Sequence, residues 1–183
     1  GEDFALKKDD YNFIPCESRN LKEMLKQIIH KSIAKGLKSD DVQILAPMYK
    51  GENGIDNLNV LLQDIFNPRT EEKKEFSYID VTYREKDKVL QLVNNPDCNV
   101  YNGDIGYIES IEEKTYPKKH LEMTINFDGN RVIYGKEDLA SIKHAYAITI
   151  HKSQGSEFAH VILPISKSYY KMLYNKLIYT GVS

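Results

Sequence analysis

The feature that most constrains the fold is a short apolar run that passes directly into a polar loop. Residues 145–150 read Ala-Tyr-Ala-Ile-Thr-Ile, the composition of a strand that is covered on both faces. A second apolar run, residues 161–165, follows the loop. Because ligands of open α/β sheets bind just beyond the carboxyl ends of strands, this order predicts a ligand-binding loop in an α/β domain. An ordinary polar loop between two core strands has the same composition, so both interpretations remain open at this point.

The side chains at the strand end and in the loop suit a phosphate-rich ligand. Thr149 and His151 are expected on one face of the predicted strand, with Ile148 and Ile150 on the other. The chain continues as Lys-Ser-Gln-Gly-Ser-Glu over residues 152–157. Hydroxyls, a cation and a glycine that opens the backbone are groups that can hold phosphate oxygens.

Composition limits the class of protein. A chain of 183 residues fits one domain, or one domain that carries a smaller one. Its net charge of −2 differs from the strongly basic balance of a dedicated nucleic-acid-binding domain. Cys16 and Cys98 lie far apart, so they suggest neither a disulfide framework nor a metal motif. No apolar run approaches the ~18 residues of a membrane span and no signal segment opens the chain, so we expect a cytoplasmic protein.

The chain up to about residue 75 alternates between helix and strand. Apolar residues at three-to-four spacing predict helices over residues 18–35 and 55–66. Ser18 can cap the first helix, and Gly36 fits the left-handed position that ends it. A buried strand is expected over residues 42–47, between the two helices. This alternation predicts an α/β fold.

From about residue 76 the periodicity changes to that of short strands. Strands are predicted over residues 89–93, 105–112, 121–127 and 131–134, and the third alternates strictly between apolar and polar side chains. Asn102-Gly103 and Asp128-Gly129 supply turn chemistry. We therefore predict a small β-barrel over residues 76–139, inserted as an autonomous unit into the α/β domain.

Four blocks of the sequence resemble one family. Residues 149–158, Thr-Ile-His-Lys-Ser-Gln-Gly-Ser-Glu-Phe, resemble the fifth conserved motif of superfamily 1 helicases and are most similar to the RecD-like branch, the exodeoxyribonuclease V alpha-subunit group. Residues 44–59, with Ala-Pro-Met-Tyr-Lys-Gly and Leu-Asn, resemble the block that opens the second motor domain of these DNA helicases. Residues 87–106, with Asp-Lys-Val and Asn-Gly-Asp-Ile-Gly, and residues 177–183 resemble two further family segments in the expected order.

The resemblance implies a fold and an activity. The fold would be α/β: a RecA-like, P-loop-NTPase-type second motor domain formed by residues 1–75 and 140–183, with an SH3-like barrel over residues 76–139. The chain has no Gly-x-x-x-x-Gly-Lys-Ser/Thr, and it stops before the arginine that the sixth motif would supply. We therefore expect a fragment, inactive alone, of an ATP-dependent helicase that moves 5′ to 3′. ATP and Mg²⁺ would be bound mainly by the first motor domain, and no cofactor is expected to bind tightly here.

The resemblance also assigns candidate site residues. The family's motif touches the phosphate backbone of single-stranded DNA, which implies nucleic-acid contacts for Lys50, Thr149, His151, Lys152 and Ser153. Gln154, Gly155 and Glu157 would approach the nucleotide, with the glutamate near the ribose. The plainer alternatives are a structural histidine for His151, an exposed turn lysine for Lys50 and a solvated acid for Glu157.

Functions other than that of a helicase have weaker support in the sequence. His151 and Ser153 are too close along the chain to act as base and nucleophile, and the histidines lack a metal-binding spacing, so we predict no catalytic or metal site. One rival is an SH3-like module on an α/β support that recruits a protein partner. Another is the helicase part of a conjugative relaxase, which shares these motifs. The expected partners are single-stranded DNA and the first motor domain, with no membrane.

Overall fold

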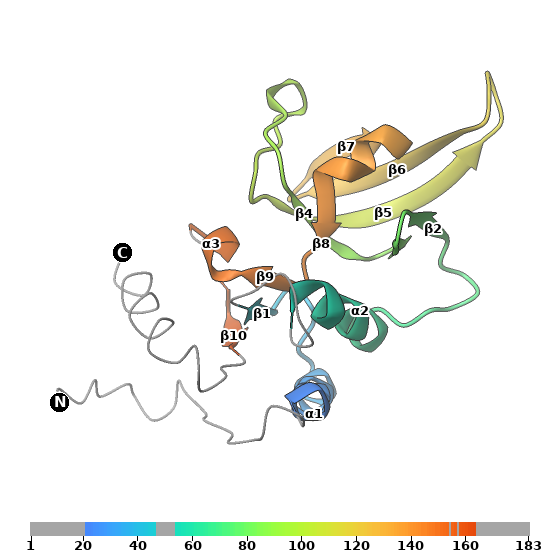
Figure 1. Cartoon of the computed structure of the whole chain (residues 1–183). Helices are drawn as coiled ribbons and strands as arrows, with labels where there is room; N and C mark the ends of the chain where they lie inside the picture. The colour runs from blue at the N-terminus through green and yellow to red at the C-terminus, as the bar shows by residue number, and fades with distance from the viewer. Residues whose placement is uncertain (1–20, 47–53, 154, 157, 164–183) are drawn as a thin grey trace, which may run out of the picture.

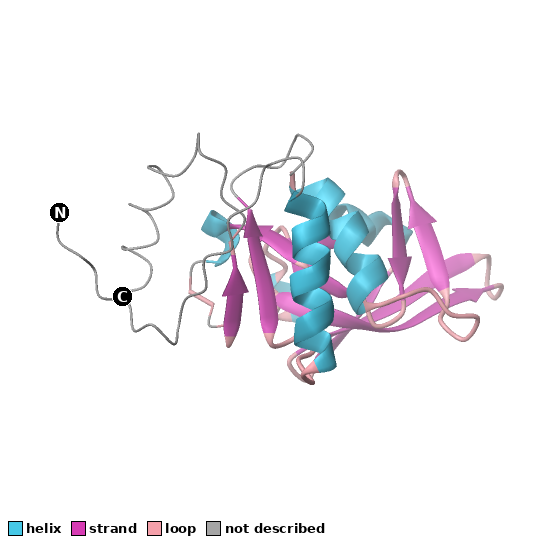
Figure 2. Cartoon of the chain, turned by 90° about the horizontal axis from the view of Figure 1, so that it is seen from below, coloured by secondary structure: helices cyan, strands magenta, loops and turns pink. Residues whose placement is uncertain are grey.

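The computed structural model describes residues 21–46, 54–153, 155–156 and 158–163 and contains a parallel sheet and an antiparallel sheet (Figure 1). In the parallel sheet, β1 (Val42–Ala46) lies between β9 (Ala147–Thr149) and β10 (His160–Ile162). Helices α1 (Leu21–Ala34) and α2 (Ile55–Phe66) lie on one side of these strands (Figure 2). The helix–strand alternation predicted for this part of the chain is therefore present.

The antiparallel sheet has five strands in the order β7-β6-β5-β4-β8. These strands are β4 (Lys88–Gln91), β5 (Ile105–Lys114), β6 (His120–Phe127), β7 (Asn130–Tyr134) and β8 (Ile142–His144). A separate hairpin, β2 (Glu75–Tyr78) and β3 (Val81–Arg84), precedes the sheet. Two 3₁₀ turns, η2 (Pro96–Cys98) and η3 (Lys136–Ser141), lie in its connections, and a short helix, α3 (Ile150–Ser153), follows β9.

Three apolar cores hold these layers together. The first lies within the antiparallel unit, and the hairpin contributes Tyr83 to it. The second joins α1 and α2 to one face of the parallel sheet. The third joins the other face of the parallel sheet, through Leu45 and Ile148, to Leu90 of β4. The two sheets are therefore packed directly against each other, and burial of apolar surface in the third core stabilises their contact.

Several sequence predictions are confirmed. The second helix spans residues 55–66 as predicted, and α1 ends before Gly36, which has a φ of +92°. Asp128 and Gly129 form the turn between β6 and β7 with φ values of 51° and 93°. Along β6, every second residue is buried, which is the alternation that the sequence predicts. Ser18 and Pro47 lie outside the described residues.

The structure differs from the predictions in the antiparallel unit. The β2–β3 hairpin was not predicted, because its turn places Ile79 at a φ of 54° instead of using a typical Asn-Gly pair. The hairpin shares the core of the five-stranded sheet but forms a sheet of its own among the described strands, so a continuous hydrogen-bonded barrel is not observed there. The last strand, β8, follows residue 139. The domain limits of 1–75 with 140–183 and 76–139 remain a prediction.

Within the part of the chain that the structure describes, no helix is both long enough and apolar enough to cross a membrane.

Gly106 offers a test of packing in the antiparallel sheet. A Cβ at this buried position would lie 2.8 Å from Cγ2 of Ile125 and 2.8 Å from Cδ1 of Phe127. We expect Gly106→Ala to lower the free energy of unfolding by about 1–3 kcal/mol through overpacking, measured by urea denaturation of the purified chain. Ser110→Ala on the same strand is the control and should change it by less than about 0.5 kcal/mol. Equal urea-denaturation midpoints for Gly106→Ala and the unmodified chain would show that the neighbouring side chains move to accommodate the added methyl group.

Candidate functional site

The polar loop begins with a helical turn at the carboxyl end of β9. Strand β9 ends at Thr149, and residues 150–153 form α3. The backbone N–H of Lys152 donates to Oγ1 of Thr149 at 3.2 Å, and the Ser153 hydroxyl donates to the Ile150 carbonyl at 2.6 Å. These two bonds occupy hydroxyls within the turn and stabilise it against extension of the strand.

The prediction that the strand continues through residue 150 and places Thr149 and His151 on one face is therefore wrong. Thr149 is buried, with 7% of its surface exposed, whereas His151 is exposed on the helical turn. Thr149 caps the turn, and capping is a structural role that the sequence reasoning did not assign to it. His151 remains available to a ligand.

The remaining candidates are placed as follows. Lys152 and Ser153 are half-buried, and Nζ of Lys152 donates to Oδ1 of Asn102. Gly155 is exposed at a φ of +80°, and no neighbouring atom lies within 4 Å of the point that a Cβ would occupy. Lys50, Gln154 and Glu157 lie outside the described residues. The structure thus gathers residues 149–153 into one turn and leaves the relation of the other candidates to it as a prediction.

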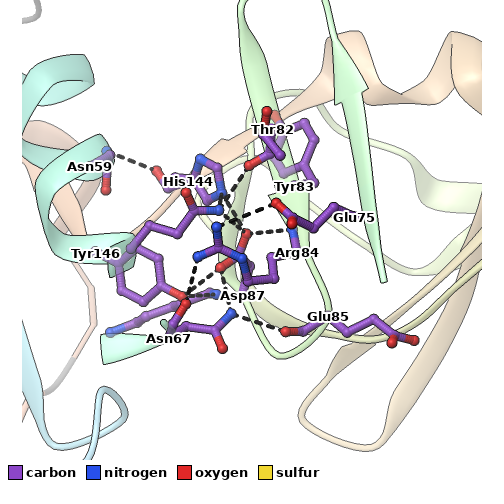
Figure 3. Close-up of polar contacts among 12 residues, drawn as sticks. Asn59, Asn67, Glu75, Thr82, Tyr83, Arg84, Glu85, Asp87, His144 and Tyr146 are labelled. Atoms are coloured by element: carbon purple, nitrogen blue, oxygen red, sulfur yellow. Dashed lines mark hydrogen bonds and ion pairs between the residues drawn. The ribbon is translucent and has the colours of Figure 1, made fainter. Parts of the chain in front are cut away.

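A buried carboxylate, which the sequence did not indicate as a site, is hydrogen-bonded to the segment that leads into β9. Asp87 is fully buried, and donors converge on it from α2, from the hairpin and from the β8–β9 segment (Figure 3). Its Oδ1 accepts from Asn67 Nδ2 and Tyr146 OH, and its Oδ2 accepts from Gln63 Nε2, the Arg84 backbone N–H and His144 Nε2, each at 2.8 Å. We call these six residues the Asp87 cluster.

Electrostatics keep this carboxylate ionised. Burial of Asp87 acts to raise its pKa, but the hydrogen bond and charge of His144, with the bonds from Asn67 and the Arg84 backbone, outweigh burial and lower the pKa below its ordinary value. The same cluster raises the pKa of the Tyr146 phenol, through burial first and then the Asp87 charge. Asp87 therefore acts as a stable acceptor and not as a group that exchanges protons near neutral pH.

A second buried charge links the cluster to the hairpin. The Arg84 guanidinium donates to the Asn67 carbonyl at 2.7 Å and to Oε2 of Glu75 at 3.3 Å, and it lies 3.5 Å from a carboxylate oxygen of Asp64. Its Nε is the one buried side-chain nitrogen or oxygen without a partner among the described residues. The end of α2 and the hairpin are thus held by charged as well as neutral hydrogen bonds.

A third polar link crosses between the two sheets. Nζ of Lys88 donates to Oε1 of Gln43 at 2.8 Å and to the Ser39 carbonyl at 2.9 Å. Gln43 in turn donates to the carbonyls of Ala145 and Tyr146, each at 3.1 Å. Burial lowers the pKa of Lys88 to about 8. These bonds fix the segment that leads into β9 and the loop.

One further side chain controls the position of β9. The Asn59 amide donates to the carbonyls of His144 and Ala147 at 3.2 and 3.0 Å, and its Oδ1 accepts from the Ala147 N–H at 2.8 Å. Asn59 belongs to the Leu-Asn pair of the helicase-like block, and its role here is to bind backbone. The pattern of a polar residue on the apolar face of α2 was the signal that could have revealed it.

The described part of the loop offers hydrogen-bond donors to a ligand. His151, Lys152 and the open backbone at Gly155 can donate hydrogen bonds to phosphate oxygens without reading a base sequence. In the described ranges, no group of three or more His, Cys, Asp or Glu residues is placed to hold a metal ion. The arrangement fits a binding surface for a phosphate-bearing ligand.

Comparisons with known proteins relate the chain to DNA helicases. Residues 58–127 match the family model of the ATP-dependent RecD-like DNA helicase SH3 domain, and residues 144–183 match that of the UvrD-like helicase C-terminal domain. The ATP-dependent RecD2 DNA helicase of Deinococcus radiodurans is 32% identical over 142 residues, which are 78% of this chain and 18% of that protein. The RecBCD enzyme subunit RecD of Buchnera aphidicola subsp. Schizaphis graminum is 29% identical over 168 residues, 91% of this chain and 25% of that subunit.

Among solved structures, unliganded Pif1 from Bacteroides sp. aligns with 75% of this chain and 49% of its own, at 18% identity and a TM-score of 0.42. The chain therefore spans about a quarter or less of the two curated relatives named above and about half of this structural neighbour.

The Asp87 cluster generates a stability prediction. In Asp87→Asn, the amide cannot accept all five donors, so we expect the free energy of unfolding at pH 7 to fall by about 3–5 kcal/mol, measured by urea denaturation. Because the folded-state pKa of Asp87 is lowered, its contribution is present above the unfolded value of about 4 and is lost as pH falls through the folded value.

The difference in free energy of unfolding between Asp87→Asn and the unmodified chain should therefore become smaller when the urea denaturation is repeated at progressively lower pH. Glu109→Gln is the matched control, since Glu109 also has a lowered pKa but lies on the surface beside Arg131. This substitution should have little effect on the free energy of unfolding. An Asp87→Asn deficit that stays constant from pH 7 to pH 3 would contradict an ionised Asp87 as the source of the stability.

Proposed function

Because this chain belongs to the RecD-like DNA helicases, we propose that it forms part of the second, RecA-like motor domain of an ATP-dependent helicase that moves 5′ to 3′ on DNA. In this proposal residues 1–75 and 140–183 build the motor domain, and residues 76–139 build the SH3-like unit. The parallel β10-β1-β9 order, with helices on one face and an antiparallel sheet on the other, supports the assignment.

The observation that carries the proposal is the helical turn at the carboxyl end of β9. There His151 is exposed, and Lys152 and Ser153 are partly exposed beside it. The end of a parallel strand is where α/β sheets bind ligands, and the His151 and Lys152 side chains can donate to phosphates independently of base sequence. We propose that this turn, together with Lys50, contacts the backbone of single-stranded DNA, and that Thr149 supports the contact by capping the turn.

The nucleotide would lie on the other side of the same loop. Gly155 has the open space and the backbone freedom that close approach of a nucleotide requires. Gln154 and Glu157 are proposed as its neighbours in this role, with the glutamate accepting a hydrogen bond from a ribose hydroxyl. ATP and Mg²⁺ would be held mainly by the first motor domain, and hydrolysis would supply the free energy that opens and closes the cleft between the domains.

The antiparallel sheet would move with the motor domain. The Asp87 cluster, the Lys88–Gln43 link and the third apolar core join it to the strand that precedes the loop. A displacement of the DNA-binding turn would therefore displace the SH3-like unit by a similar amount. This coupling favours a role for the sheet in guiding the tracked or displaced strand over a role as a freely tethered module that docks a protein partner.

A histidine substitution tests the DNA contact. In the full-length protein, His151→Ala should weaken binding of single-stranded DNA by about three- to tenfold, since one phosphate contact is lost, with similar losses for oligonucleotides of different base composition. Nucleotide affinity should be unchanged. Fluorescence anisotropy with labelled oligonucleotides and a labelled ATP analogue gives both affinities. His120→Ala, which removes a histidine from the start of β6, is the matched control.

Loss of nucleotide affinity with unchanged DNA affinity would show that the two halves of the loop have been assigned the wrong way round. If His151→Ala changes neither the DNA affinity nor the nucleotide affinity, the DNA track lies elsewhere, and the protein-docking alternative becomes the better hypothesis.

The 183-residue chain by itself should not hydrolyse ATP. Its sequence contains no Gly-x-x-x-x-Gly-Lys-Ser/Thr to hold the phosphates, so neither the metal nor the γ-phosphate would be positioned for attack by water. Phosphate release with Mg²⁺, ATP and single-stranded DNA should stay at the level of a protein-free blank, while the full-length protein serves as the positive control. DNA-stimulated turnover that co-purifies with the chain would refute this division of labour.

A further inference from the structure

A side-chain contact joins two of the segments that resemble helicase sequences. Lys152 of the α3 turn donates from Nζ to Oδ1 of Asn102, which lies 50 positions earlier in the turn between β4 and β5. Both residues reach the surface, with Asn102 exposed and Lys152 half-buried. The contact connects the antiparallel sheet directly to the loop that we assign to DNA.

The turn that carries Asn102 is held in place by its own hydrogen bonds. The Asn102 N–H donates to Oδ1 of Asn94 at 2.9 Å, and the Gly103 N–H donates to the Gln91 carbonyl at 2.8 Å. Asp104 accepts from the Tyr101 N–H at 2.8 Å. The Asn102 side chain is thus presented from a fixed backbone, which is what a group that orients a long, flexible lysine requires.

Both ends of the contact also belong to one packed unit. Gly103 and Asp104 line a pocket with Ser156 and Phe158 of the motif loop, so the turn and the loop face each other beyond this single bond. Asp40, Asp104 and Lys88 all line that pocket, so its walls carry charges of both signs. Lys152 is not among the residues that line this pocket and its side chain is partly exposed, so a DNA phosphate would meet it at the outer surface.

We infer that Asn102 is a positioning residue for Lys152 in DNA binding, an inference that rests on the DNA contact proposed above. The lysine ammonium has three donors, so Asn102 can accept one hydrogen and leave two for phosphate oxygens. By fixing the ammonium, Asn102 reduces the side-chain entropy that Lys152 loses when DNA binds. The antiparallel sheet thereby contributes to DNA affinity through a residue that does not itself contact the phosphate.

A double-mutant cycle in the full-length protein tests this inference. Binding of a labelled oligothymidylate is measured for the unmodified protein, Asn102→Ala, Lys152→Ala and the double variant across a series of salt concentrations. Lys152→Ala should weaken binding about fivefold and reduce the slope of log affinity against log salt by about 0.7, the value for one phosphate contact on a single strand. Asn102→Ala should weaken binding about two- to threefold when Lys152 is present and by a negligible factor when it is absent.

Two control variants separate positioning from general damage. Asn126→Ala removes an asparagine of the same sheet whose hydrogen bonds go to Glu109 and to the Gly129 N–H, and Lys118→Ala removes a surface lysine from the turn between β5 and β6. Neither should change DNA affinity, and the melting temperature of Asn102→Ala should equal that of the unmodified protein.

The outcomes distinguish the two levels of the argument. If Lys152→Ala weakens binding and lowers the salt slope, but Asn102→Ala has no effect or costs the same factor in both backgrounds, the positioning role is wrong and the DNA contact stands. Tighter binding by Asn102→Ala would mean that the asparagine competes with phosphate, which also overturns positioning. Unchanged affinity and slope for Lys152→Ala would overturn both the contact and the inference that rests on it.

Discussion

The arrangement of this protein depends on one buried carboxylate, that of Asp87. It accepts hydrogen bonds from five donors on α2, the hairpin and the β8–β9 segment, and no single one of these elements could satisfy it alone. Burying an ionised carboxylate without partners would cost several kcal/mol, so the folded state is reached only when these segments are in place together. The carboxylate therefore stabilises the fold only when the helix end, the hairpin and the strand all donate to it at the same time.

The other buried charges next to Asp87 also connect separate elements of the fold. Arg84 and Lys88 flank Asp87 in sequence, and each reaches a different neighbour: Arg84 extends to the end of α2 and to the hairpin, and Lys88 reaches Gln43 on the central parallel strand. The apolar contacts of Leu45, Leu90 and Ile148 between the sheets are non-directional and would tolerate small sliding movements. The directional bonds of Lys88 and Asp87 remove that freedom, because a shift of about 1 Å would lengthen several hydrogen bonds together.

The periodic elements could be predicted from the sequence, and the hydrogen bonds of the Asp87 cluster could not. Apolar spacing identified α2 and the alternation of β6, and Gly36 and Asp128-Gly129 marked turns, because each of these signals depends on neighbouring residues alone. Asp87 and His144 look like ordinary polar residues near strand ends, and their partnership depends on a contact between segments 57 positions apart. Thr149 lies in a strand, as predicted, but the helical turn that its hydroxyl caps was not predicted, because the β-branched run before the turn does not indicate a helix. The β2–β3 hairpin escaped prediction for a similar reason, because Ile79 occupies a backbone conformation that its residue type rarely adopts.

The position of the Asp87 cluster has a mechanical consequence for the proposed motor. Strand β8 pairs with β4 in the antiparallel sheet, and after Ala145 and Tyr146 the chain becomes β9 of the parallel sheet and then the α3 turn, the proposed DNA contact. His144, the last residue of β8, and Tyr146, in the connection, both belong to the Asp87 cluster. The chain is therefore held by buried hydrogen bonds at the point where it passes from one sheet to the other. A hinge between the sheets would have to break these buried bonds, whereas rotation of both sheets as one body breaks none of them. Cleft closure in such a motor would therefore carry the SH3-like unit with the proposed DNA-binding turn, and the surface bond between Lys152 and Asn102 would keep the same geometry throughout the movement.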